Sequence, residues 1–277
     1  MQPQYFSPQA EGYTNIRPDK YIRSIYRDKE GTVWAGGYYN FKGMNFATGE
    51  INHYQTEYPI TVITSKSAEE LWVGTVNGIY KFNKKNKGFT QEPSLANIGT
   101  VNSIYQANDE LTYIGTSGSG LCLYNNRTGE LKTCDTSNSA LISNNIFCIL
   151  PSTSEDELII STDNALVCFN TQKGSFQNWT KEQGMLTDNF NTSAGVKTQK
   201  GEILFGCENG LVLIKDSIQL PSKFKSKLVF SDLNIRYQQM LPGEEDSPLN
   251  APIDQTEEIT LTHDQNIFSL DVSSINY

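Results

Sequence analysis

One pattern of two short strands and a tight turn occurs five times along this chain of 277 residues. Its clearest copy is residues 70–83, where two stretches of alternating apolar residues flank Asn77-Gly78, a pair that favours the positive φ of a two-residue hairpin turn. A repeat built only from strands and turns, with a period of about 40–45 residues, predicts an all-β fold of β-propeller blades. The other copies cover residues 32–46, 111–125, 157–170 and 202–214, and the large apolar anchors of the five units are Trp34, Trp72, Tyr113, Ile159 and Leu204.

Each unit also has strand-like stretches on both sides of its hairpin, which makes four antiparallel strands per blade. The fifth unit lacks an outer strand, and Tyr5 to Ser7 resembles one. Two closures are therefore open: a five-bladed ring completed by this segment, or an open portion of a larger ring. We assign residues 1–222 to the propeller. Inner strands are predicted at 21–26, 61–64, 101–105, 146–150 and 194–197, and outer strands at 50–55, 89–92, 130–134 and 176–180.

Residues 223–277 form a separate small β unit by the same reasoning. Residues 259–263 and 268–272 alternate in polarity on either side of Asp264-Gln265-Asn266, which predicts a hairpin. An immunoglobulin-like sandwich needs about 100 residues, so this segment supplies about half of one. Its last strand is expected to leave an open edge that pairs with another chain or is disordered.

Composition and charge exclude two classes of partner. A net charge of −9 argues against a nucleic-acid-binding surface, which needs clustered Lys and Arg. The one basic run, residues 81–87, falls at a predicted hairpin turn and is interpreted as a solvated turn. No run of 18 apolar residues and no signal peptide is present, so we expect no membrane contact from this segment.

The cysteines show neither the spacing of a metal site nor a CxxC pair, and they fall in or near predicted strands. Small buried side chains are therefore the favoured interpretation. Cys122 and Cys134 could face each other across one hairpin and form a disulfide, which is the alternative. The five cysteines are Cys122, Cys134, Cys148, Cys168 and Cys207.

The sequence indicates no catalytic residue, no metal site and no cofactor. The two histidines, His53 and His263, lie in different predicted domains, and neither stands in a turn that would present a nucleophile. Metal-ligand and phosphate-loop motifs are absent. Carboxylate pairs for glycoside hydrolysis stay open as a possibility, because a propeller can bring acids together from different blades.

A ligand-binding face follows from the blade topology. Strands alternate in direction, so the turn between the second and third strands and the connection from each outer strand to the next inner strand emerge on the same face. The first unit has seven positions from Gly36 to Gly43 where the second has four from Gly74 to Gly78, so we interpret residues 38–41 as an exposed aromatic insertion.

Aromatic faces beside amide groups suit sugar rings, although a loop folded onto a neighbouring blade or subunit is an alternative. Trp34, Trp72 and Trp179 are instead interpreted as packing residues. The candidate ligand-binding residues are Tyr38, Tyr39, Asn40, Phe41, Asn77, Asp163, Asn164 and Asn209.

The repeat resembles a known family. Trp72-Val73-Gly74-Thr75 followed by residues 77–83 is similar to the two-component regulator propeller repeat in extracytoplasmic sensor regions of hybrid histidine kinases from gut Bacteroidetes. Residues 182–211 resemble that family's final blade, and residues 228–277 resemble the start of its Tyr-Tyr-Tyr domain. The chain departs from the family in showing five units, where family rings have seven blades, and in having Ser161 and Ala165 where glycines are usual.

This resemblance implies a periplasmic sensor that recognises a small glycan-derived oligosaccharide. It also implies that ligand binding changes the packing of a homodimer and thereby a kinase across the membrane. Two other functions are weighed against it: a propeller-fold glycan lyase or glycosidase, and a protein-binding scaffold of the WD-repeat kind.

Overall fold

The computed structural model describes residues 21–185, 187–214, 227–244 and 246–275. The chain divides into two compact units, Met1–Ile218 and Gln219–Tyr277. The sequence predicts a boundary between residues 222 and 223, four residues after this division. Both positions lie outside the described residues.

The first unit consists of five antiparallel sheets in chain order, four with four strands and the last with three among the described residues. The inner, hairpin and outer strands predicted from the repeat are confirmed within one to four residues at their ends. In order, the sheets are β1 (Ile22–Arg27), β2 (Thr32–Gly37), β3 (Asn40–Asn45) and β4 (Glu50–Gln55); β5 (Ile60–Ser65), β6 (Glu70–Thr75), β7 (Gly78–Asn83) and β8 (Gly88–Gln91); β9 (Thr100–Gln106), β10 (Leu111–Ser117), β11 (Leu121–Asn125) and β12 (Leu131–Cys134); β13 (Ile146–Pro151), β14 (Glu157–Thr162), β15 (Leu166–Asn170) and β16 (Ser175–Trp179); and β17 (Phe190–Lys197), β18 (Ile203–Cys207) and β19 (Gly210–Ile214).

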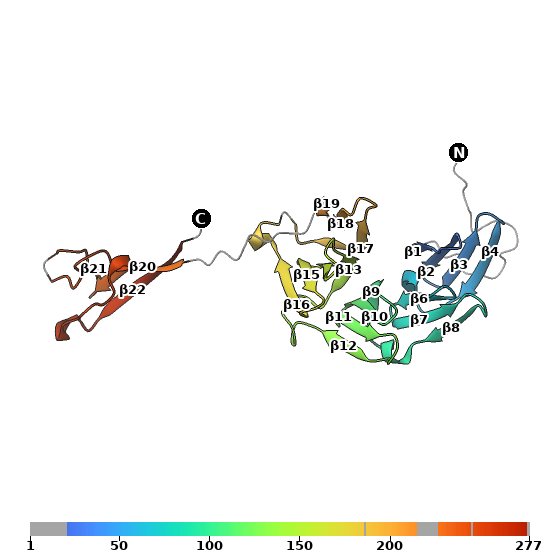
Figure 1. Cartoon of the computed structure of the whole chain (residues 1–277), viewed down its shortest axis with the longest axis horizontal. Helices are drawn as coiled ribbons and strands as arrows, with labels where there is room; N and C mark the ends of the chain where they lie inside the picture. The colour runs from blue at the N-terminus through green and yellow to red at the C-terminus, as the bar shows by residue number, and fades with distance from the viewer. Residues whose placement is uncertain (1–20, 186, 215–226, 245, 276–277) are drawn as a thin grey trace. The chain divides into compact units, whose positions relative to one another are not determined.

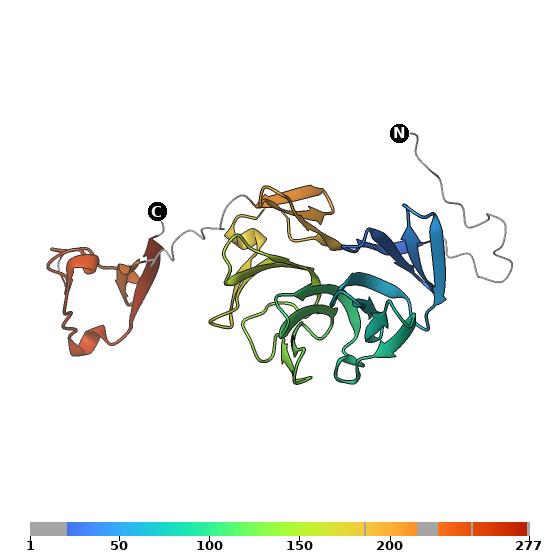
Figure 2. The same cartoon turned by 45° about the vertical axis from the view of Figure 1, so that its right-hand side comes forward.

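The five sheets follow one another with their first strands innermost and their fourth strands outermost (Figures 1 and 2). The first strands touch in sequence: β1 contacts β5, β5 contacts β9, β9 contacts β13 and β13 contacts β17. Radial packing of four-stranded sheets is the β-propeller arrangement, so the predicted fold class is confirmed for this unit.

The hydrophobic core lies between the sheets, where each blade packs on the next. Trp34 and Phe41 of the first sheet join Ile60, Leu71 and Phe82 of the second in one buried cluster. Trp72 and Tyr113 occupy the same place at the following two interfaces, and both are almost fully buried. These three anchors therefore pack between blades, as predicted for Trp34 and Trp72, and Trp179 is also buried.

In the first three blades, a glycine in the second strand lets the blade approach the next one closely. A Cβ atom on Gly115 would lie 2.5 Å from Cγ2 of Ile146, the first residue of β13. Gly36 stands in the same relation to Ile60 of β5. At these interfaces the distance between blades leaves no room for a Cβ atom, whereas the fourth blade has the fully buried Ser161 at this position.

Gly115→Ala should destabilise the propeller by about 1–3 kcal/mol, because the methyl group overlaps Ile146 and forces the two sheets apart. The free energy of unfolding, measured in urea, checks this. Gly88→Ala is a matched control: its nearest neighbour would be the flexible side chain of Asn86, at 3.2 Å, and a change within about 0.5 kcal/mol is expected. Equal losses in the two variants would contradict the close-approach explanation.

The innermost strands are also joined by side-chain hydrogen bonds. The N–H of Ile63 in β5 donates to Oγ of Ser24 in β1 (3.0 Å), and the N–H of Ile149 in β13 donates to Oγ of Ser103 in β9 (3.0 Å). Each inner strand has one edge without a strand partner, so these hydroxyls satisfy backbone groups that would otherwise be unpaired.

Three of the hairpins are closed by a buried threonine. The hydroxyl of Thr75 donates to the carbonyl of Gly78 (3.0 Å), Thr116 to Gly120 (2.9 Å), and Thr162 to Ala165 (3.0 Å). The fourth hairpin keeps this hydrogen bond although Ala165 stands where the second has Gly78, whose φ of 83° a non-glycine residue rarely adopts.

The first hairpin differs from the expected aromatic insertion. Gly36 pairs with Phe41 in the register in which Gly74 pairs with Ile79, so the first turn contains two residues, Tyr38 and Tyr39, like the second. The interpretation of residues 38–41 as an aromatic insertion is therefore wrong. Gly43 is not the turn glycine: it lies beside Trp34, whose Cζ3 atom would be 2.8 Å from a Cβ at that position.

The fifth sheet ends at β19, which has no further strand beside it among the described residues. Leu211 and Leu213 of β19 and Val196 of β17 are exposed. Tyr5 to Ser7, the segment proposed to complete this sheet, lies outside the described residues, so neither ring closure is decided.

The second unit contains one sheet in the order β21 (Gln238–Gln239), β20 (Lys227–Ile235) and β22 (Phe268–Ile275). The hairpin expected from 259–263 and 268–272 is wrong, because β22 pairs with β20. Residues 263–265 form a short 3₁₀ helix that begins with a Thr262–Gln265 capping box, and Ile259 and Leu261 pack against the core without forming a strand. The assignment of this second unit to an immunoglobulin-like sandwich stays a prediction.

The cysteines are free thiols, and no disulfide joins Cys122 to Cys134. In the sheet, Cys134 pairs with Leu121 and Cys122 pairs with Thr133, so the two side chains point to opposite faces. Burial raises the pKa of the Cys148 thiol to about 12, which keeps it protonated at neutral pH.

Candidate functional site

The exposed aromatic surface on the predicted face consists of Tyr38 and Tyr39, at the turn between β2 and β3, and Tyr21. Their side chains are 43%, 48% and 67% exposed. The ring centroids of Tyr38 and Tyr39 are 6.4 Å apart, Tyr21 meets Tyr38 edge-on at 6.2 Å, and the guanidinium of Arg23 lies 5.8 Å from the Tyr38 centroid. Two tyrosines of the predicted site thus form a platform open to solvent.

The other two residues of the predicted aromatic segment are not available to a ligand. Asn40 is 3% exposed, and Phe41 is fully buried with its ring stacked at 5.1 Å on Trp34 and edge-on at 4.8 Å to Phe82. The hairpin register explains the division, because the residues that follow the two-residue turn return at once to the sheet.

A cavity of about 220 Å³ lies between the first two sheets on this same face. Its wall includes residues 55–58, the connection from β4 to β5, together with Tyr80 of β7. The N–H of Thr56 donates to the carbonyl of Tyr39 (3.2 Å), which places the cavity next to the exposed tyrosines.

The cavity combines aromatic faces with polar groups. The rings of Tyr58 and Tyr80 are 6.3 Å apart with an interplanar angle of 34°. The hydroxyl oxygen of Thr56 is buried and has no hydrogen-bond partner among the residues that the structure describes. Burial raises the pKa of Tyr80, with the Glu57 carboxylate and Tyr58 adding to the shift, so its phenol is a neutral hydrogen-bond donor at neutral pH.

The polar candidates on the other blades have structural roles in their own turns. Both carboxylate oxygens of Asp163 accept hydrogen bonds, from the Ser143 hydroxyl (2.5 Å) and the Asn145 amide (2.7 Å). Asn77 and Asn164 lie in threonine-closed hairpins, where their backbone N–H groups donate to Thr75 and Thr162. Asn209 is exposed in the turn between β18 and β19.

None of the contacts among the described residues joins these polar candidates to one another or to Tyr38 and Tyr39. Sequence reasoning missed Thr56, Tyr58 and Tyr80. The connection from the first outer strand to the next inner strand was expected on this face, and an aromatic residue at position 58 of that connection was the available signal.

Within the described part of the chain, no group of three or more His, Cys, Asp and Glu residues is placed to hold a metal ion. His53 is half-buried on β4, as expected, and burial together with the nearby charge of Lys42 lowers its pKa. No helix among the described residues has the length and apolar character that crossing a membrane requires.

Comparison with known protein families finds a match to a family of repeats. The model described as "Two component regulator propeller" matches residues 17–39, which include β1 and most of the first hairpin. The chain carries a two-component regulator propeller repeat. The matched segment contains Trp34 and Gly36, which both pack against the second sheet.

Solved structures share the fold of the chain. The extracellular domain of BT3049 from B. thetaiotaomicron, described as a hybrid two component system, matches with a TM-score of 0.56 at 21% identity over 94% of this chain and 42% of that one. The extracellular domain of BT4673 from the same organism, described as a one component system, matches with a TM-score of 0.55 at 15% identity over 91% of this chain and 46% of that one. The chain thus spans less than half the length of either structure.

A third match shows that the shared feature is the propeller itself. The WD40 β-propeller domain of Doa1 has a TM-score of 0.57 at 15% identity, covering 73% of this chain and 66% of that one. No match was found among the curated proteins.

Proposed function

We propose that this chain is part of the extracytoplasmic ligand-sensing region of a two-component signalling protein, and that it binds a glycan-derived oligosaccharide. The two-component regulator propeller repeat at residues 17–39 supports the sensor role. The similar structures from B. thetaiotaomicron are extracellular domains, which supports a location outside the cytoplasm, and we propose the periplasm.

The observation that carries the ligand proposal is the cavity of about 220 Å³ beside Tyr38 and Tyr39. A sugar ring has an apolar face that stacks on an aromatic side chain and hydroxyl edges that form hydrogen bonds. The exposed tyrosine platform supplies the first kind of contact. The Tyr80 phenol and the unpartnered Thr56 hydroxyl supply the second.

Signalling requires that the ligand bind one arrangement of the sensor more tightly than another, because equal affinity for both would shift no population. We propose that the two arrangements are those of a homodimer of the whole protein, coupled to a histidine kinase elsewhere in it. A segment that senses without catalysing fits the repeat it carries, so no enzymatic activity is proposed.

Calorimetric titration with a panel of defined neutral oligosaccharides tests this proposal. For an oligosaccharide that binds, the double variant Tyr38→Ala/Tyr39→Ala should weaken the affinity at least about tenfold, which corresponds to about 1.4 kcal/mol of lost stacking. Tyr237→Ala is the matched control, since this tyrosine is 94% exposed in the other compact unit. An affinity unchanged by the double variant would rule out the tyrosine platform.

A further inference from the structure

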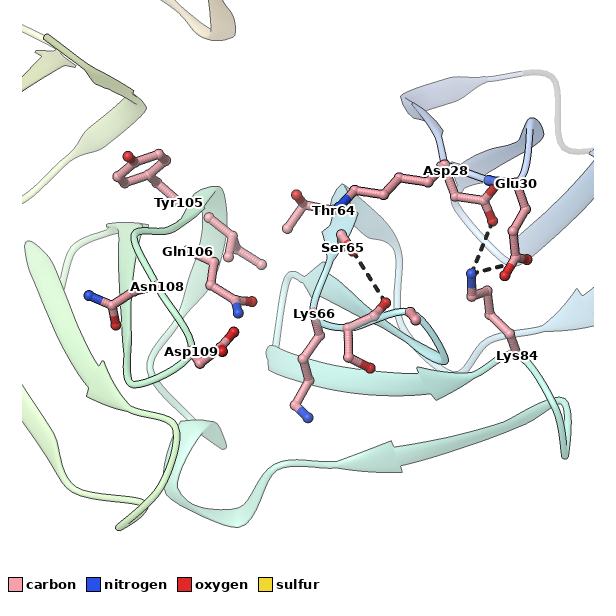
Figure 3. Close-up of a pocket in the computed structure, with 14 residues that line it drawn as sticks. Asp28, Glu30, Thr64, Ser65, Lys66, Lys84, Tyr105, Gln106, Asn108 and Asp109 are labelled. Carbon is pink, nitrogen blue, oxygen red and sulfur yellow. Dashed lines mark hydrogen bonds and ion pairs between the residues drawn. The ribbon is translucent and has the colours of Figure 1, made fainter. Parts of the chain in front are cut away.

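A second and larger cavity opens at the opposite ends of the sheets. Its volume is about 660 Å³, within the range of small-ligand pockets, and it lies among the turns that connect first to second strands in the first three sheets (Figure 3). These turns are residues 28–31, 66–69 and 107–110. The sequence assigned no function to this end of the propeller.

Most of the charge around this cavity is already paired within the protein. The ammonium of Lys84 lies 3.3 Å from Oδ2 of Asp28 and 3.4 Å from Oε2 of Glu30, and Lys66 lies 2.6 Å from Oε2 of Glu70. Both lysines therefore form ion pairs within the protein, so their positive charges are already compensated.

Two charged side chains that line the cavity have no such partner. Lys29, from the first sheet's turn, and Asp109, from the third sheet's turn, are exposed and form no ion pair or side-chain hydrogen bond within the described structure. They come from different blades, so the cavity carries one uncompensated positive group and one uncompensated negative group. The formal charge of its lining is zero, with Lys29, Lys66 and Lys84 against Asp28, Glu30 and Asp109.

The third feature is a buried acceptor without a donor. The side-chain oxygen of Gln106, at the end of β9, is shielded from solvent and has no hydrogen-bond partner in the described part of the chain. Figure 3 shows Gln106 and Asp109 on the same wall of the cavity, across from Thr64 and Asp28. A buried unpaired carbonyl costs about 1–3 kcal/mol, a cost that a donor on a bound molecule would remove.

We propose that this cavity binds a small zwitterionic ligand of the amino-acid or short-peptide class. Its ammonium group donates hydrogen bonds to the Gln106 oxygen and the Asp109 carboxylate, and its carboxylate pairs with Lys29. A neutral sugar leaves both charged groups unused, and a purely anionic or cationic ligand uses only one of them. The site is distinct from the tyrosine platform, and the proposal does not depend on the function proposed above.

The test is calorimetric titration of the whole chain with triglycine, N-acetyltriglycine, triglycinamide and maltotriose. These probes carry both terminal charges, only the negative one, only the positive one, and none. Triglycine should bind, and removal of either terminal charge should weaken binding at least tenfold. Failure of triglycine to bind, or binding of maltotriose or of either blocked peptide as tight as that of triglycine, would overturn the proposal.

Variants assign the binding to this cavity. Gln106→Leu, Asp109→Asn and Lys29→Gln should each weaken triglycine binding about tenfold or more, with Asp109→Asn leaving the weaker affinity for N-acetyltriglycine unchanged. The double variant Tyr38→Ala/Tyr39→Ala is the control and should bind triglycine as the unmodified chain does. Loss of triglycine binding in that control with none in the three cavity variants would place the site elsewhere and overturn the assignment.

Discussion

Phe41→Ala should destabilise the propeller by about 3–5 kcal/mol, the usual cost of removing a fully buried aromatic side chain. The Phe41 ring is fully buried between the first two sheets, in contact with Trp34, Phe82 and Phe89. Urea denaturation followed by tryptophan fluorescence reports on this unit selectively, because all three tryptophans of the chain lie in it.

Tyr38→Ala is the matched comparison, only three residues away in the same hairpin. Its ring is 43% exposed and touches two tyrosines and an arginine, so a loss of at most about 1 kcal/mol is expected. The aromatic-insertion interpretation treats the two residues alike. Similar losses in the two variants would therefore contradict the observed strand register.

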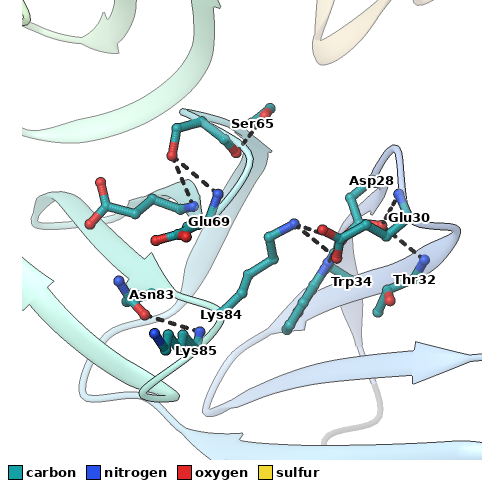
Figure 4. Close-up of polar contacts among 11 residues, drawn as sticks. Asp28, Glu30, Thr32, Trp34, Ser65, Glu69, Asn83, Lys84 and Lys85 are labelled. Atoms are coloured by element: carbon teal, nitrogen blue, oxygen red, sulfur yellow. Dashed lines mark hydrogen bonds and ion pairs between the residues drawn. The ribbon is translucent and has the colours of Figure 1, made fainter.

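Asp28→Ala should destabilise the same unit by about 2–4 kcal/mol. The Asp28 carboxylate is buried and accepts hydrogen bonds from Nε1 of Trp34 (2.9 Å), from the N–H of Thr32 (2.9 Å) and from Lys84 of the second sheet (3.3 Å), as Figure 4 shows. Removing it leaves the Trp34 and Thr32 donors without this acceptor, and it leaves the largely buried Lys84 ammonium with only the exposed Glu30 carboxylate as an ion-pair partner among the described residues. Lys29→Ala, in the same turn but exposed, should change the free energy of unfolding by less than about 0.5 kcal/mol.

The effect of Asp28 should also depend on pH. Burial raises the pKa of this carboxyl, but the hydrogen bonds from Trp34 and Thr32 and the charge of Lys84 outweigh burial and lower it below the ordinary value of 3.8. The unfolded chain therefore takes up the proton first as the pH falls, so the stabilisation is complete above about pH 5 and declines below it. Unfolding measured from pH 7 to pH 3 should show the difference between Asp28→Ala and the unmodified chain decreasing below about pH 5, and a constant difference would contradict this account.

The repeats use the position of Asp28 in different ways. Lys66 is the equivalent of Asp28 in the second sheet. The N–H of Asp28 donates to the carbonyl of Thr32, the first residue of β2, and the N–H of Lys66 donates to the carbonyl of Glu70, the first residue of β6. Lys66 cannot accept a hydrogen bond from Trp72, and its ammonium lies 5.4 Å from the centroid of the indole ring, with Nε1 of Trp72 left unpartnered. The anchor tryptophan thus donates a hydrogen bond to a carboxylate in the first blade, whereas in the second blade it lies beside an ammonium group.

Lys84 illustrates what the charge pattern of a sequence leaves undecided. The basic run at residues 81–87 was interpreted as a solvated turn, which is correct for Lys85 and Lys87. Lys84 instead turns inward, with a side chain only 14% exposed, because Asp28 of the neighbouring blade lies within reach. The two residues are 56 positions apart, and no local pattern relates them.

The candidate site shows the same division. The expected face and its exposed tyrosines followed from strand alternation and turn position. The count of residues between glycines failed at the first hairpin, since Gly43 makes room for a tryptophan ring and does not form the turn. The hairpin predicted in the second unit is wrong for a related reason. β22 pairs with β20, a longer strand some 40 residues earlier in the chain, and not with the residues just before it.

The amino-acid sequence by itself determined the blades, their strand order and some of the residues that pack between them, such as Trp34 and Trp72. These depend on local properties: alternation with period two, short turns between the alternating stretches, and an apolar anchor at each repeat. Only the tertiary structure decided which charges meet and which oxygens, such as those of Gln106 and Thr56, are buried without partners. Those outcomes arise where turns from different blades converge, and the distances between such turns are set by the packing of whole sheets.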